Sequence, residues 1–363
     1  MKHISIQTKL GKNYYEDQAM KLSEILLAVL AVMFVNSCSS YYYVVTDVGK
    51  DLSVDRMIYA EASDSRSSSG FISPEIWAES SVDESFEVDF YDRICEMGMV
   101  YRTGAERISD LSFQPDKDNK GNPLFSPVET LDKRFRWFYT YYDYSARFKS
   151  LKDMLPLALD GYITPEQRAL FFKGQEPPQG WNGIEMYYLL DDVNSKFAEW
   201  YSDAVFLALQ NMVRPYCSED QTMILDECRD DFMKNLDRTA VFIMEPDDFV
   251  ARLAEIYPDA GFDKVYDDNA GSLKSAYEKE AVLISYFGYS FIFTMDMPGK
   301  YYEGNAVDFI DGNPSWKVDA FRLIDEDLVL EAVSRKLNVW AFVLTFALII
   351  LLLQVFAKVF ARR

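Results

Sequence analysis

The feature that most constrains this chain is the apolar run at residues 339–357, VWAFVLTFALIILLLQVFA, which has no charged side chain in 19 positions. As a helix it would extend about 28 Å, enough to cross the core of a bilayer. The tail KVFARR carries Lys358, Arg362 and Arg363, and Trp340 falls where an interfacial aromatic ring helps to fix a helix. The sequence therefore predicts a transmembrane helix with a basic cytoplasmic tail over residues 337–363.

A second apolar run, ILLAVLAVMFV at residues 25–35, is too short for a comfortable membrane span and fits the hydrophobic region of a signal peptide. The next residues, Val35-Asn36-Ser37-Cys38, resemble the lipobox of bacterial lipoproteins. This resemblance implies that residues 1–37 are a signal peptide, with a true start at Met1 or Met20, and that Cys38 is lipidated. The alternative is a plain signal anchor with an incidental cysteine.

Both ends of the chain thus place residues 38–338 outside the cytoplasm. A single apolar helix with a basic flank is typical of the inner (plasma) membrane, so the sequence predicts a single-pass bacterial membrane lipoprotein with its ectodomain on the periplasmic side. Between the anchors there are 30 basic and 55 acidic side chains. Such a field repels nucleic acid, which is excluded as a partner, whereas a cation, a basic partner or a merely solvated acidic surface all fit.

The only histidine, His3, precedes the expected cleavage point. A mature chain without histidine excludes Ser-His-Asp and Cys-His catalysis and His-ligated zinc, and no cofactor is expected. Among Cys95, Cys217 and Cys228, an oxidising compartment favours one disulfide and one free thiol. A helix expected between Cys217 and Cys228 would separate them by roughly 16 Å. Pairing of Cys95 with either of them, or three buried thiols, therefore stay open as alternatives.

The hydrophobic period changes twice along the chain. Residues 38–145 are β-rich, with strand patterns such as SFEVDFYD and an aromatic strand expected over 134–144. Residues 146–287 are helical, with capping boxes at Thr164–Gln167 and Ser218–Gln221 and a long amphipathic helix over 184–213. The strand pattern returns in a membrane-proximal region over 288–336. The predicted fold is α+β, a β-sheet domain interrupted by a largely helical insertion and followed by the membrane helix. Two separate domains are the alternative.

In the long helix, one face at helical spacing is apolar and is expected to be buried. Its members are Leu189, Leu190, Val193, Phe197, Trp200, Tyr201 and Val205.

The segment that leads into the membrane helix, residues 297–340, contains Pro298-Gly299, Asn305, Gly312 and Trp316. It resembles the end of a loose class of bacterial lipoproteins of unknown function, the LppM-like proteins, although Ala306 replaces a usual glycine. The resemblance implies β-structure just above the membrane and brings no catalytic residues.

Three patterns are candidate sites. Asp116 and Asp118 begin a partial calcium loop, in which Lys120 and Pro127 stand where oxygen donors are needed, so a solvent-exposed turn is favoured. The aromatic residues of 134–144 are candidates for stacking on sugar rings. The pairs Asp191-Asp192, Asp230-Asp231 and Asp247-Asp248 are candidates for glycoside acid–base chemistry, or else solvated helix faces.

We therefore expect a non-catalytic interaction, scaffold or sensor role with an envelope protein as partner. The alternative is a carboxylate-dependent enzyme or a binding protein that acts on cell-wall or other polysaccharide.

Overall fold

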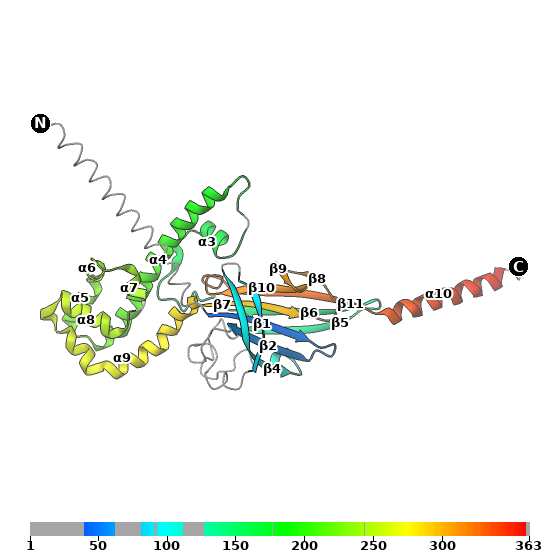
Figure 1. Cartoon of the computed structure of the whole chain (residues 1–363), viewed down its shortest axis with the longest axis horizontal. Coiled ribbons are helices and arrows are strands. Elements are labelled where there is room, and N and C mark those ends of the chain that lie inside the picture. The colour runs from blue at the N-terminus through cyan, green and yellow to red at the C-terminus, as the bar shows by residue number, and fades with distance from the viewer. Residues whose placement is uncertain are drawn as a thin grey trace, which may run out of the picture. The chain divides into compact units, whose positions relative to one another are not determined.

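The computed structural model describes residues 40–61, 81–90, 93–111, 127–175, 177–242 and 244–360. Cys38, Asp116 and Asp118 lie outside these residues. Within them the chain forms two compact units, a β unit built from Ser40–Leu151 with Tyr289 onward, and a helical unit at Lys152–Gly288 (Figure 1). The predicted α+β fold, with a helical insertion between two stretches of strands and an apolar C-terminal helix, is confirmed.

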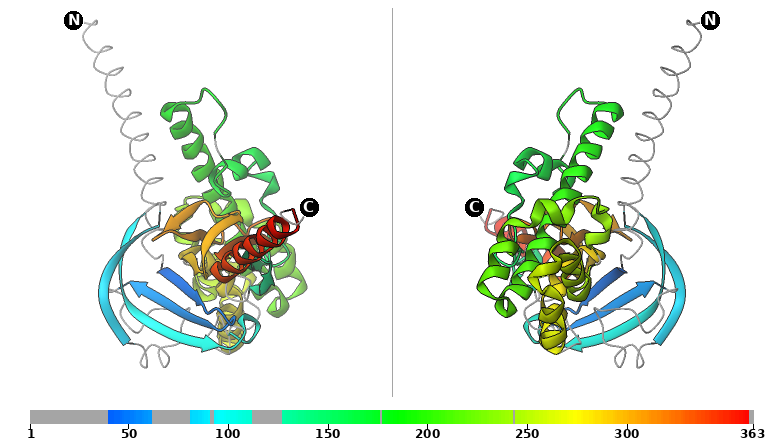
Figure 2. Two further views of the ribbon diagram at one scale, coloured as in Figure 1. Left: turned by 90° about the vertical axis from the view of Figure 1, so that its right-hand side faces the viewer. Right: turned by 90° about the vertical axis from the view of Figure 1, so that its left-hand side faces the viewer.

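The β unit contains a seven-stranded sheet in the order β3-β4-β2-β1-β7-β10-β9 and a four-stranded sheet in the order β5-β6-β11-β8. All neighbouring strands are antiparallel except β1 and β7. Figure 2 looks along the strands and shows β3 and β4, in cyan, curving around one side. The strands are β1 (Ser40–Val48), β2 (Val54–Glu61), β3 (Ser81–Asp89), β4 (Ile94–Ala105), β5 (Val128–Phe135), β6 (Tyr139–Phe148), β7 (Tyr289–Asp296), β8 (Lys300–Gly304), β9 (Asp308–Ile310), β10 (Asn313–Asp319) and β11 (Leu328–Leu337).

The two sheets pack face to face. Phe148 contacts Phe293 edge-to-face with 5.3 Å between ring centroids, and Tyr144 lies against Trp316. Strand β1 is buried on both of its faces, because Tyr42 stacks on Phe291 while the next residue along the strand packs in a separate cluster with Phe90 and Met97. This double burial explains why YYYVV is continuously apolar rather than alternating.

One prediction for this unit is wrong. The aromatic segment 134–144 is not one strand, because a turn at residues 136–138 separates β5 from β6 and the Arg136 N–H donates to the Tyr139 carbonyl. The turn contains neither glycine nor proline, which are the usual sequence signals for a hairpin.

In the helical unit the longest helix, α4, is surrounded by shorter ones. The predicted capping boxes of α3 and α5 are both present, and Asn182 and Glu185 form a third at the start of α4. The helices are α3 (Pro165–Phe171), α4 (Gly183–Val213), α5 (Glu219–Glu227), α6 (Arg229–Met233), α7 (Arg238–Phe242), α8 (Pro246–Ile256) and α9 (Phe262–Ser285).

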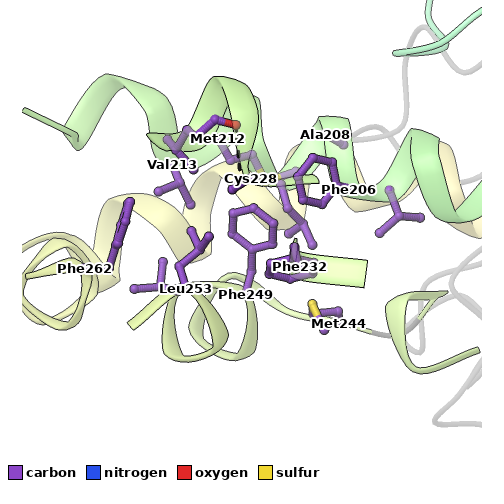
Figure 3. Packing of buried hydrophobic residues seen from close by; sticks show 14 of the residues in the cluster. Phe206, Ala208, Met212, Val213, Cys228, Phe232, Met244, Phe249, Leu253 and Phe262 are labelled. Atoms are coloured by element: carbon purple, nitrogen blue, oxygen red, sulfur yellow. Dashed lines mark hydrogen bonds between the residues drawn. The ribbon is translucent and has the colours of Figure 1, made fainter. Parts of the chain in front are cut away.

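The core of this unit is built on the C-terminal half of α4. Figure 3 shows Phe206 facing Phe232 and Phe249, with 5.2 Å between the Phe206 and Phe232 centroids. Phe232 comes from α6 and Phe249 from α8, so the three rings join three helices. Of the predicted buried face, Val193, Trp200 and Val205 are buried, whereas Leu190 is exposed. The reason for its exposure is that the first turns of α4 extend beyond α5–α9 (Figure 1).

The last helix, α10 (Val339–Phe360), has a mean hydropathy of 2.6 over its most apolar 18 residues. In the described part of the chain it is the one helix long and apolar enough to cross a membrane. It follows β11 directly and continues away from the sheets (Figure 1).

Candidate functional site

The base of α10 is attached to the β5–β6 turn by hydrogen bonds. The Asn338 side-chain amide donates to the Arg136 carbonyl at 2.9 Å, and its oxygen accepts from the Thr140 hydroxyl at 3.0 Å. Trp137 Nε1 donates to Thr345 Oγ1, inside the helix, at 2.8 Å. These bonds position one end of the β unit against the point where the chain would enter a membrane.

Three exposed aromatic rings surround this junction. Phe135 is stacked on Trp340 with 6.2 Å between centroids, and Trp137 meets the same indole edge-to-face at 5.3 Å. Their exposed fractions are 56%, 44% and 53% for Phe135, Trp137 and Trp340. Large exposed rings around the end of an apolar helix are typical of the membrane–water interface. We call these three residues the aromatic collar.

Lysine side chains from three different segments meet at the same end of the β unit. Lys133 Nζ donates to the Lys50 carbonyl, and Lys336 is the second-last residue of β11. Loss of hydration, followed by the neighbouring Lys50 and Lys133 ammonium groups, lowers the pKa of Lys336. The lowered pKa thus reflects lost hydration first and the proximity of the two other ammonium groups second. We call Lys50, Lys133 and Lys336 the lysine trio.

Carboxylates from three adjacent strands lie beside the trio. In the strand register Asp47 of β1 is directly opposite Asp55 of β2 and Asp296 of β7. Like charges opposite one another destabilise a sheet. Partial burial, then Asp296 and Asp55, raise the pKa of Asp47. We call these three residues the carboxylate row.

A pocket of about 650 Å³ opens between the two groups of charges. Lys50 and Lys336 line it together with Asp47 and Asp296, and the β1–β2 turn and Pro298 complete its wall. Its position beside Lys336 places it close to the base of α10.

In the helical unit, the start of α4 exposes an apolar stripe. Trp181, Ile184, Tyr187 and Tyr188 are 39%, 67%, 60% and 67% exposed. The spacing of Ile184, Tyr187 and Tyr188 puts them on one side of the helix, and Trp181 directly precedes the N-cap residue Asn182. The capping box at Asn182 satisfies the first backbone N–H groups, so this end is helical without cover from the rest of the unit. We call these four residues the α4 stripe.

Deeper in the same unit, a polar cluster connects three segments. The Tyr162 hydroxyl donates to Asp203 Oδ2 at 2.7 Å, and Arg229 Nη2 donates to Asp203 Oδ1 at 2.6 Å. Burial and the Asp203 carboxylate raise the pKa of Tyr162 to about 12. The arginine compensates the charge of a nearly buried aspartate, so the role of this cluster is to stabilise the fold.

The carboxylate pairs predicted as catalytic candidates are spread over separate helices and do not form one group. Asp192 accepts from Lys196 and Gln167, and Asp230 from Arg229. Asp247 and Asp248 lie in the first turn of α8, where negative charge favours the helix dipole.

A separate depression of about 520 Å³ lies beside the start of α5 and the end of α8, and its lining includes Asp220, Asp259 and Tyr257. Within the described residues, no group of three or more His, Cys, Asp or Glu side chains is placed to hold a metal ion.

Cys95, Cys217 and Cys228 are free thiols in the structure. Cys95 lies in the β unit, while Cys217 and Cys228 flank α5, the helix expected between them. Burial raises the pKa of the Cys228 thiol to about 11.

The aromatic residues of β6 alternate as a strand requires. Tyr142 and Tyr144 face the core, and the rings of Tyr139 and Tyr141 lie under the guanidinium groups of Arg335 and Arg134.

Comparison with protein-family models, with curated proteins and with solved structures finds no match to this chain. We call the pocket of about 650 Å³ the membrane-side pocket, because it adjoins the base of α10. Apart from Pro298, its lining residues were not singled out from the sequence, and neither were those of the α4 stripe. The sequence contains one indication of each site. For the pocket it is the basic pair Arg335-Lys336 just before the apolar helix, and for the α4 stripe it is the group of large apolar side chains around the capping residue Asn182.

Proposed function

We propose that this protein is a membrane-anchored envelope lipoprotein whose role is interaction, as a scaffold, accessory subunit or sensor. In this proposal the β unit stands on the outer face of the inner membrane, and the helical unit binds a protein partner. The C-terminal helix α10 and its basic flank support the anchoring. The lipobox-like residues before Cys38 support the lipid.

The observation that carries the interaction role is the α4 stripe. Three large exposed side chains on one side of a helix, with an exposed tryptophan just before it, are typical of a docking surface, because aromatic residues dominate binding energy at interfaces. The exposed Glu185 and Asp191 flank the stripe. The partner that fits is therefore a protein with an apolar patch bordered by lysine or arginine side chains.

The experiment is site-specific photocrosslinking in cells, with a photoreactive amino acid at Tyr188. Glu255, an exposed residue of α8 in the same unit, is the matched control position. We expect one membrane or envelope protein to be captured from position 188 and not from 255, and Ile184→Asp to abolish the capture while circular dichroism stays unchanged. Equal capture from both positions would refute the role of the stripe.

Capture of polysaccharide instead of protein would favour the alternative, a carbohydrate-directed function. Asp220 and Asp259, which line the depression of the helical unit, would then be the first carboxylates to substitute.

The lipid anchor has its own test, which is metabolic labelling with palmitate. We expect incorporation in the native chain and none in Cys38→Ala. Label that persists in Cys38→Ala would refute lipidation at Cys38.

A further inference from the structure

The membrane-side pocket is lined by charged residues of both signs, and none of them belongs to the surface proposed to bind a protein partner. Lys50 and Lys336 line the same open surface pocket of about 650 Å³ as Asp47 and Asp296. Among the described residues, neither of these carboxylates forms an ion pair. The pocket therefore offers an unneutralised group of each sign.

Its height above the membrane follows from the chain. Lys336 precedes Val339, the first residue of α10, by three residues, which is about 10 Å of extended chain. The polar headgroup layer on each side of a bilayer is roughly 5–8 Å thick. Because a lysine side chain reaches several ångströms further, the Lys336 amine would be within reach of the headgroups of a bilayer that α10 crosses. The aromatic collar marks the same level.

The charges on each side of the pocket repel their own kind. Loss of hydration and then the Lys50 and Lys133 ammonium groups lower the pKa of Lys336, and partial burial and then the Asp296 and Asp55 carboxylates raise the pKa of Asp47. An anion beside the lysines and a cation beside the carboxylates would each relieve this repulsion. A ligand that carries both groups a few ångströms apart satisfies both sides at once, which a simple anion or a metal ion does not.

We propose that the pocket binds the headgroup of a phospholipid that carries a phosphodiester and a primary ammonium, as in phosphatidylethanolamine. Lys50 and Lys336 donate hydrogen bonds to the phosphate oxygens. Asp47 and Asp296 accept hydrogen bonds from the ammonium. A quaternary ammonium has no N–H to donate, and an anionic headgroup without an amine brings its phosphate near the carboxylates without compensation.

The test is native mass spectrometry of the full chain, purified in detergent and supplied in turn with phosphatidylethanolamine, phosphatidylcholine and phosphatidylglycerol of identical acyl chains. We expect phosphatidylethanolamine to be retained most strongly, about tenfold over phosphatidylcholine. The reason is that the loss of one charge-assisted hydrogen bond weakens binding by at least that factor. Equal retention of the three lipids, or a preference for phosphatidylglycerol, overturns the proposal.

Variants separate the two halves of the site. Lys50→Gln with Lys336→Gln is expected to weaken all three lipids, whereas Asp47→Asn with Asp296→Asn is expected to remove the preference for phosphatidylethanolamine alone. Lys149→Gln is the control, because Lys149 is exposed and follows the end of β6 opposite to α10. If the control reduces binding as much as the lysine pair does, the pocket is not the site.

A last arm identifies the source of the headgroup. Soluble glycerophosphoethanolamine, which lacks acyl chains, is added in excess, and we expect no displacement of the lipid. Displacement when its concentration is comparable to that of the lipid would show that the pocket recognises a soluble phosphoethanolamine compound, and it would overturn the lipid assignment.

Discussion

The guanidinium of Arg56 lies buried between the two sheets. It donates to both carboxylate oxygens of Glu129, at 2.7 and 3.0 Å, and its Nε donates to the Thr46 hydroxyl. Burial disfavours its charge, but the Glu129 carboxylate raises the pKa of the guanidinium above its ordinary value. The two residues are 73 positions apart, so no local pattern in the sequence indicates the pair.

Glu129→Gln is therefore expected to destabilise the β unit by about 3 kcal/mol or more, because it leaves a buried charge without its counter-charge. Denaturant unfolding of the full chain measures the loss. Asp143→Asn, which removes the exposed partner of Arg134 in the same hairpin, should have a much smaller effect. Similar losses for the two variants would contradict the assigned role of Arg56.

Tyr162 predicts a pH dependence in the helical unit. Its pKa is about 12 when folded, against an ordinary value of 10.0. A raised pKa means that folding retains a proton which the unfolded chain releases, so this contribution is complete below pH 10 and is lost as the pH rises toward 12. Unfolding midpoints between pH 9 and 12 should fall less steeply for Tyr162→Phe than for the native chain. Identical slopes would indicate that other groups cause the alkaline loss.

At the scale of single elements, sequence reasoning succeeded where the determinants are local. Thr164 and Ser218 cap their helices as predicted, because a capping box depends on residues three positions apart. It failed for the β5–β6 hairpin, whose turn is stabilised by contacts of Trp137 and Phe138 with α10 rather than by turn residues. It also placed Leu190 in the core, since periodicity does not show where a helix projects beyond its neighbours.

Strand β8 depends on a glycine. Gly304 has a φ of 151°, and a Cβ there would collide with the Glu331 carbonyl of the paired strand β11. Gly304→Ala is expected to cost about 2 kcal/mol or more in stability. Gly271→Ala, in an open position of α9, should instead stabilise by about 0.5–1 kcal/mol. Thermal unfolding of both variants measures the contrast, and a neutral Gly304→Ala would show that β8 can shift.

At the scale of the whole molecule, composition and period predicted the presence of two kinds of structure but not which strands are neighbours. Ser40 is paired with Tyr289, and Leu328 with Phe148. Pairings across such separations depend on how the two whole sheets pack. This packing cannot be predicted from any short stretch of the sequence. The lysine trio and the carboxylate row exist only because of these pairings, so the membrane-side pocket could not be predicted.

The same pairings predict an order of folding. The residues of the helical unit are continuous in the sequence, from 152 to 288. Strand β1 can pair with β7 only when the chain on both sides of this insertion has been brought together. Contacts between residues far apart in sequence form late, because the entropy of closing the loop between them is lost before the contacts stabilise the chain. Pulse-labelling hydrogen exchange during refolding should protect α4 and α8 amides before those of β1 and β7. Simultaneous protection of the two sets would exclude this order.

The direction of β1 has a mechanical consequence. The strand runs toward the pocket beside α10, so Ser40 lies at the far end of the sheet, about 30 Å from that pocket. One residue, Ser39, separates Ser40 from Cys38, so the reach between them is roughly 7 Å. If the strands stood upright on the membrane that α10 crosses, a lipid on Cys38 could therefore not reach the same leaflet while β1 is fully paired. If Cys38 carries the proposed lipid and this lipid enters the membrane that α10 crosses, the strands lie along the bilayer, with a bend at Asn338; if it enters a facing surface, the paired sheet spans the distance between the two attachment points.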